Sequence, residues 1–133
     1  MEKFLYLEIV SPEKKVFSGN VISVTAPGIL GEFQVLYNHA SLVSTLETGR
    51  IKLTDENNKE EIFATSGGVL EVKNNKVSIL AESVERKDEI DIQRAEKSLA
   101  DSESEYSNAK TMAEKDEKYN SVKRAKNRIK IAK

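Results

Sequence analysis

The chain has 133 residues, of which 21 are basic and 22 acidic, so its formal net charge at pH 7 is −1. This length allows one domain, or one small domain with an appendage, and the charge balance excludes a strongly basic nucleic-acid-binding protein. The chain has no cysteine and one histidine, His39, which excludes disulfides, cysteine-ligated metals and multi-histidine sites, so we expect no metal site. No uncharged stretch is long and apolar enough to span a bilayer, so we expect no direct insertion into a membrane.

The first 84 residues have the pattern of short β-strands. Apolar residues alternate with their neighbours at Leu5, Leu7 and Ile9, and again at Ile22, Val24 and Ala26. Further strands are predicted over 51–53, 62–64, 69–73 and 76–81. Asn74-Asn75 is a candidate two-residue hairpin turn, because asparagine tolerates positive φ better than most residues. Short strands spaced in this way predict an antiparallel β-sandwich or barrel.

Residues 85–133 contain no glycine or proline and have the pattern of two helices. Asp88 is the predicted cap of the first helix, with Asp91 in its first turn, and a turn is predicted over 107–111. The expected apolar stripes are Ile92, Ala95, Leu99, Ser102 and Tyr106 on the first helix, and Met112, Tyr119, Val122, Ala125 or Lys126, Ile129 and Ala132 on the second. The predicted fold class is therefore α+β, with an antiparallel β-sandwich over 1–84 and a two-helix antiparallel hairpin over 85–133.

Charge differs between the two predicted helices. Residues 82–108 carry nine acidic and four basic side chains, net −5, whereas residues 110–133 carry three acidic and nine basic side chains, net +6. Two solvated faces that attract each other would explain this pattern, and from charge alone this interpretation is favoured over a basic helix offered to an acidic partner. RNA is a weaker alternative, because Tyr119 is the only aromatic residue in the basic helix.

No set of residues has the order or spacing of a catalytic site. His39 lies in no recognised arrangement with a nucleophile and a carboxylate, and Gly28-Ile29-Leu30-Gly31 lacks the Lys-Ser/Thr ending of a phosphate-binding loop. We therefore expect that the chain is not an enzyme by itself.

Three segments together resemble the epsilon subunit of bacterial rotary ATP synthase. They are Phe17-Ser18-Gly19 after a Ser-Pro-Glu opening, the run from Gly28 to Val43 (GILGEFQVLYNHASLV), and Ser66-Gly67-Gly68-Val69-Leu70-Glu71-Val72 continuing into Val77-Ser78-Ile79-Leu80-Ala81-Glu82. Their order and spacing agree with that family, and the similarity covers the whole chain. Two features depart from it: Ser41 stands where a proline commonly follows the His-Ala pair, and the hairpin is only loosely similar.

The resemblance implies a non-catalytic rotor subunit. Its sandwich would bind the gamma subunit and rest on the c-subunit ring, with Glu32 and His39 contacting the ring. Its hairpin would either fold against the sandwich or extend into the alpha/beta catalytic head, where it inhibits ATP hydrolysis. The basic residues implied to contact beta are Lys123, Arg124, Lys126, Arg128 and Lys130. The implied location is peripheral, on the cytoplasmic face of the bacterial cell membrane, and a free-standing β-sandwich protein-binding module is the alternative.

A second part of the resemblance concerns nucleotide. Ile90-Asp91-Ile92-Gln93-Arg94-Ala95 matches the pattern Ile/Leu-Asp-x-x-Arg-Ala of epsilon subunits that bind ATP, so no cofactor is required but a regulatory MgATP is implied. The implied site residues are Glu85, Ile90, Asp91, Arg94, Ala95, Arg124 and Arg128. Two observations oppose this: Asp91 and Arg94 could simply pair with each other, and Asp101 places a carboxylate where some strong binders have arginine.

Overall fold

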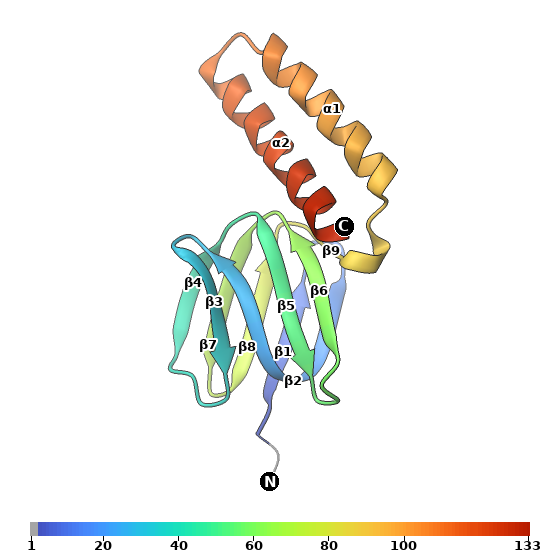
Figure 1. Cartoon of the computed structure of the whole chain (residues 1–133). Coiled ribbons are helices and arrows are strands. Elements are labelled where there is room, and N and C mark those ends of the chain that lie inside the picture. Colours follow the sequence, from blue (N-terminus) through green and yellow to red (C-terminus); the bar gives the residue numbers. More distant parts are fainter. Residues whose placement is uncertain (1–2) are drawn as a thin grey trace.

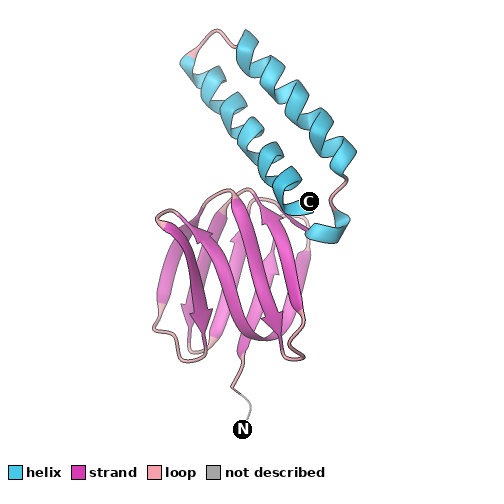
Figure 2. Ribbon diagram, viewed as in Figure 1, coloured by secondary structure: helices cyan, strands magenta, loops and turns pink. Residues whose placement is uncertain are grey.

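The computed structural model describes residues 3–133 as a β-sandwich with a helical hairpin standing on one end, away from the N-terminus (Figures 1 and 2). The elements in chain order are β1 (Leu5–Val10), β2 (Lys15–Gly28), β3 (Gly31–Leu36), β4 (Leu42–Leu46), β5 (Gly49–Asp55), β6 (Glu60–Thr65), β7 (Gly68–Lys73), β8 (Lys76–Ala81), β9 (Val84–Arg86), the 3-10 helix η1 (Lys87–Glu89), α1 (Ile92–Asn108) and α2 (Met112–Ala132). The predicted fold class, a sandwich followed by a helical hairpin, is confirmed.

The long strand β2 joins the two layers of the sandwich. Its first half pairs with β1, and its second half lies between β3 and β5. One layer continues from β1 through β8 and β7 to β4, and the other continues from β5 through β6 to β9. The pairings are antiparallel except that of β1 with β8, which is parallel.

Side chains from both layers fill a single core between them. Leu5, Leu7 and Ile9 are fully buried, as their alternation predicts. In β2, however, the buried residues are Val21, Val24, Ala26, Pro27 and Gly28, and Ile22 is only partly buried. The register between β2 and β5 shifts between Val21 and Ser23. Such a bulge adds one residue and reverses the inward–outward phase, so the predicted inward position of Ile22 is wrong.

Three strands, β3, β4 and β9, were not resolved by hydrophobic alternation. β9 pairs with β6, with Glu85 opposite Ala64 and Arg86 opposite Phe63. The sheet therefore continues two residues beyond the cut predicted after Val84. Arg86 anchors this end of the sheet: it forms an ion pair with Glu61, donates to the Val16 carbonyl oxygen over 3.2 Å, and lies over the Phe63 ring.

The helices begin at side-chain caps. Asp91, and not Asp88, caps α1, because its carboxylate accepts a hydrogen bond of 3.1 Å from the Arg94 amide. Asp88 lies in η1, and Ile90 is extended between the two helices, so the predicted cap was placed one turn too early. Thr111 caps α2 through the Glu114 amide. The connection between the helices covers 109–111, which lies within the predicted turn of 107–111, but Ser107 and Asn108 still belong to α1.

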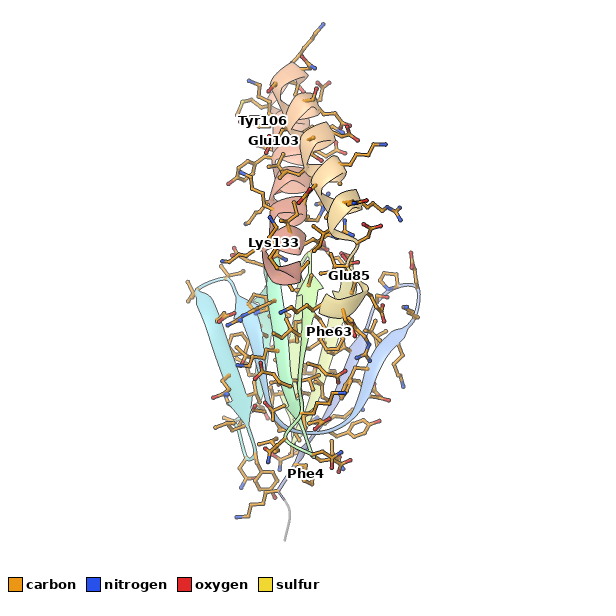
Figure 3. All side chains as sticks on the ribbon, turned by 45° about the vertical axis from the view of Figure 1, so that its right-hand side comes forward. Phe4, Phe63, Glu85, Glu103, Tyr106 and Lys133 are labelled. Carbon is orange, nitrogen blue, oxygen red and sulfur yellow. The ribbon has the colours of Figure 1, made fainter. Side chains whose placement is uncertain are left out.

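Small side chains allow the two helices to pack closely. Ala95 and Ser102 of α1 and Ala125 of α2 are buried. Tyr106 lies near the far end of the hairpin (Figure 3). Its ring packs against that of Tyr119 with centroids 6.4 Å apart, and Lys118 pairs with Glu105 over 2.7 Å. Met112 is 75% exposed, so its predicted place in the apolar stripe is wrong. Within residues 3–133 neither helix has the length and apolar character needed to cross a membrane.

Candidate functional site

The hairpin contacts the sandwich mainly through the last turns of α2. Ile131 packs against Ala64 of β6 and Ile90 of the connecting segment, and these three side chains are buried. Ile62 and Ala132 complete this cluster, which is separate from the sandwich core. The apolar part of the docking contact is therefore small, and it depends on a helix end.

Two polar contacts reinforce this docking. The Asn127 side-chain amide donates to the Gly49 carbonyl oxygen over 2.8 Å and to the Thr65 carbonyl oxygen over 3.5 Å. Arg128 forms an ion pair with Glu85 of β9, which lies where the sandwich meets the helices (Figure 3). Because both side chains of this pair are about 30% exposed, its contribution to docking is only partly screened by water.

A polar cleft of about 650 Å³ lies between the hairpin and the sandwich. It brings together four of the seven residues of the predicted nucleotide site: Glu85, Arg94, Arg124 and Arg128. The hairpin supplies the three arginines, whereas the carboxylates, Glu13 and Glu85, come from the sandwich. The volume lies within the ~300–1,000 Å³ of ordinary small-molecule sites.

The other three predicted residues do not line this cleft. Asp91 caps α1 with its carboxylate, Ala95 is buried in the hairpin, and Ile90 packs against Ala64 and Ile131. Their observed roles are structural: Asp91 caps the start of α1, and Ile90 packs in the connection between β9 and α1. Asp101 is exposed on α1 and is absent from the cleft lining.

Several hydroxyl groups in the cleft escaped sequence reasoning. Ser98 and Ser102 follow Arg94 at intervals of four, which places all three on one face of α1. Ser121 precedes Arg124 by about one turn of α2, and its hydroxyl accepts a hydrogen bond of 3.0 Å from that guanidinium. The spacing from the arginines was the available signal for these serines. Thr65, Ser66 and Ser83 of the sandwich complete the hydroxyl lining.

Guanidinium and hydroxyl groups in this arrangement suit an anionic ligand with oxygen acceptors. Arginine binds phosphate through charge-assisted, often bidentate hydrogen bonds, and serine hydroxyls can donate to the same oxygens. Within residues 3–133 no cluster of three or more His, Asp or Glu side chains could hold a metal ion.

With α2 docked on the sandwich, the basic residues predicted to contact beta point to different sides of the helix. Arg124 and Arg128 line the cleft, whereas Lys130 lines a second cavity of about 680 Å³ on the other side of the helix. Lys123 and Lys126 are exposed. In this conformation the five side chains do not form one continuous basic surface.

Glu32 and His39, the predicted ring contacts, lie toward opposite ends of β3: Glu32 is the second residue of the strand, and His39 follows its last residue. Glu32 is near the hairpin end, where it pairs with Arg50 over 2.9 Å and shares the second cavity with Lys130. His39 follows the far end, where the Asn38 amide donates to the Asn75 side chain over 2.6 Å. At ~3.3 Å per residue, β3 separates the two by well over 10 Å. The hydrogen bond with Arg50 holds the pKa of Glu32 below its ordinary value, and the nearby charges of Arg50, Lys130 and Lys52 lower it further.

An apolar row crosses the outer face of the β1–β8–β7 layer. Val10 of β1 pairs with Leu80 of β8, and Leu80 pairs with Val69 of β7. Leu80 is 61% exposed and Val69 is 41% exposed. With Pro12 they line a shallow groove of about 530 Å³. Exposed, contiguous apolar surface of this kind is typical of protein contacts.

Comparison with known proteins decides the family. The family described as ATP synthase, Delta/Epsilon chain, beta-sandwich domain matches residues 4–87. An ATP synthase epsilon chain of Anaeromyxobacter dehalogenans is 38% identical over 132 residues, covering 96% of this chain and 97% of that one. The chain belongs to the ATP synthase epsilon chain family. The resemblance found in the sequence is confirmed, and so is the expectation of a non-catalytic subunit in place of an independent enzyme.

Other relatives agree with this membership. ATP synthase epsilon chains of Desulfosudis oleivorans and Carboxydothermus hydrogenoformans are 45% and 47% identical over 96 and 93 residues, or about 70% of each chain. A chain in the Euglena gracilis mitochondrial ATP synthase (OSCP/F1/c-ring) shares the fold, with a TM-score of 0.83 over 96% of this chain and 80% of that one at 19% identity. A chain in the central stalk/c-ring of Tetrahymena thermophila ATP synthase has a TM-score of 0.71 at 17% identity, covering 96% of each chain.

Proposed function

We propose that this epsilon-family chain is the rotor subunit that couples gamma to the c ring and restrains ATP hydrolysis through its hairpin. The observation that carries the proposal is the match over the whole chain, hairpin included, to an ATP synthase epsilon chain. Two structural neighbours come from assemblies whose descriptions include the c ring. The proposed location is the cytoplasmic face of the bacterial cell membrane, as a peripheral part of the complex with the alpha/beta head.

The apolar row of Val10, Val69 and Leu80 is the proposed contact with gamma. Leu80→Asp places a charge in the centre of this row, and a buried unpaired charge is costly in an interface. The variant should co-purify with gamma and the c ring from membranes at least tenfold less than the wild type. Met112→Asp, at an exposed apolar residue far along the hairpin, is the matched control. If the wild type, Leu80→Asp and Met112→Asp co-purified equally well with gamma and the c ring, the assignment would be wrong.

The c-ring contact, as proposed, runs along β3. Glu32 lies at the start of this strand and His39 follows its end, so a contact that includes both must follow its length. Single cysteines at the two positions test this without interference, since the chain has none of its own. Both should cross-link to c-subunit loops in the assembled enzyme, and cross-links only to beta would contradict the proposal.

For regulation, we propose that MgATP binds in the polar cleft and holds the hairpin in its docked position. The three arginines and the serine hydroxyls support a phosphate-bearing ligand, and the cleft exists only while α2 contacts the sandwich. When the hairpin leaves, the five α2 residues predicted to contact beta are free to meet an acidic segment of that subunit. A ligand at a hundredfold excess over its Kd adds about 2.7 kcal/mol to the state that binds it, which is enough to shift a marginal docking equilibrium.

Thermal melting of the isolated chain tests nucleotide binding. Millimolar MgATP should raise the Tm of the wild type, and this rise should disappear in Arg94→Gln/Arg124→Gln, which removes one cleft arginine from each helix. Lys97→Gln/Lys123→Gln is the matched control, because it removes the same charge from exposed positions of the same helices. An unchanged Tm in the wild type would reject the nucleotide site while leaving the rotor assignment intact.

A further inference from the structure

Three kinds of side chain follow one another around the last turns of α2. Successive residues of an α-helix are ~100° apart, so Asn127 lies centrally between two groups. Arg124 and Arg128 lie to one side, where they line the polar cleft, and Lys126 and Lys130 lie to the other. Asn127 itself lines both cavities. The rotation of α2 about its axis therefore decides whether arginine or lysine faces the cleft.

The contact of Asn127 with the sandwich is well suited to fix this rotation. Gly49 and Thr65 are cross-strand partners at the end of the β5–β6 ladder, where β5 begins and β6 ends. The Asn127 amide nitrogen donates to both of their carbonyl oxygens. A primary amide has two N–H groups, so it can satisfy two acceptors at once. The side chain thus occupies the position where a further pair of sheet hydrogen bonds would form, and it links α2 to both β5 and β6.

We propose that Asn127 is the positioning residue of the hairpin, which fixes both the docked position of α2 and the face that α2 turns toward the cleft. Ile131, one turn later, packs on Ala64 and Ile90. This apolar contact favours docking but does not fix the rotation of α2, because an aliphatic side chain forms no directional hydrogen bonds. The Glu85–Arg128 ion pair must loosen if Arg128 is to bind a phosphate ligand. The Asn127 contacts use only backbone acceptors and remain in place when a ligand enters. This inference rests on the proposed function in one respect only, the link between hairpin docking and nucleotide binding.

The chemistry of the side chain sets the expected order of variants. Asn127→Asp replaces the donor with a carboxylate that faces two carbonyl oxygens, so it should undock the hairpin most strongly. Asn127→Ala removes both hydrogen bonds and should lower the docked-to-undocked ratio by about tenfold. Asn127→Ser keeps one donor and should fall between the wild type and alanine. Asn120→Asp and Asn120→Ala are matched controls, because Asn120 is exposed on the same helix.

Distance measurement in the isolated full chain tests docking without nucleotide. Spin labels on Glu103→Cys, near the far end of the hairpin, and Lys73→Cys, on the sandwich, should give one narrow distance in the wild-type background (Figure 3). The distribution should broaden in the order serine, alanine, aspartate at position 127, while circular dichroism retains the helical signal. Both Asn120 variants should keep the narrow distance.

Either of two distance results would overturn the inference: a narrow distance in Asn127→Asp, or equal broadening in Asn120→Asp. A parallel titration with MgATP separates this inference from the nucleotide proposal. If the wild type binds no MgATP but the Asn127 series still broadens in order, the nucleotide proposal fails and the positioning role of Asn127 stands. If MgATP binds equally well to Asn127→Asp and the wild type, the positioning role is wrong.

Discussion

At Glu32, the ion pair with Arg50 is the main reason that the pKa of the carboxyl group is lowered. The Arg50 guanidinium donates to this carboxylate over 2.9 Å, and it is the largest cause of the lowered pKa. Replacing Arg50 with Gln should therefore raise the pKa of Glu32 toward its ordinary value, and Lys130→Gln should raise it less, because Lys130 acts only through its charge at a distance. Carboxyl-carbon NMR titration of Glu32 measures both shifts, and a larger effect of Lys130→Gln would contradict this geometry.

The Glu32–Arg50 pair also predicts how the stability of the fold changes with pH. The pKa of Glu32 is lower in the folded chain than in the unfolded chain, so its contribution is present above the ordinary glutamate pKa. The contribution is lost as pH falls through the lowered pKa. Urea unfolding over this acid range should show a steeper loss of stability in the wild type than in Arg50→Gln. Both side chains are more than 40% exposed, so the difference should be small.

Asp91 has two candidate roles that the sequence could not distinguish, contact with a nucleotide and capping of α1. The Ile/Leu-Asp-x-x-Arg-Ala pattern implies a nucleotide contact, whereas the structure shows the carboxylate capping α1 at the Arg94 amide. Asparagine caps helices as well as aspartate does, and alanine costs ~1 kcal/mol. Asp91→Asn should therefore keep both the protection of the Arg94 amide from hydrogen exchange and any rise of Tm with MgATP, whereas Asp91→Ala should lose protection. If Asp91→Asn keeps the protection but loses the nucleotide effect, the carboxylate contacts the ligand directly.

At the scale of elements, alternation and turn chemistry predicted the sandwich strands where one face is buried. They failed at Ile22 because a bulge changes the phase of β2 and alternation alone carries no sign of it. β9 is three residues long and has no fully buried side chain, so its assignment depends on pairing with β6, which lies some 20 residues earlier in the chain. The cleft was partly predictable because Arg124 and Arg128 share a helix face. The serines of α1 and α2 share helix faces with the arginines, and this spacing was the signal that could have found them. Asn127 could not be found from the sequence, because its role depends on where α2 meets the sheet.

The short strand β9 should mark the true end of the sandwich. A chain of residues 1–87 retains β9 and the anchored Arg86, whereas a chain of residues 1–83 loses both. We expect cooperative melting in both, with a lower Tm for residues 1–83, because each kcal/mol lost corresponds to ~4–8 °C in a domain of this size. Calorimetry measures the difference. Equal Tm values would show that β9 and Arg86 add nothing to the sandwich.

For the whole molecule, the sandwich and the hairpin differ in how they are stabilised. The sixteen residues of the main core all come from the sandwich strands. The hairpin is attached through one small apolar cluster, the Asn127 amide and the Glu85–Arg128 pair. An element held by so few contacts can be redirected by a ligand or partner with a few kcal/mol of differential binding. This contrast is the physical basis for assigning assembly to the sandwich and regulation to the hairpin.

The most direct test of this account is the rate of ATP hydrolysis by the ATP synthase assembled with the full chain or with residues 1–87. Both forms should assemble with gamma and the c ring, because the proposed contacts all lie in the sandwich. The complex with the shortened chain should hydrolyse ATP several times faster, since the hairpin that we propose to be inhibitory is absent. Equal rates from two fully assembled complexes, or failure of residues 1–87 to assemble, would contradict the account.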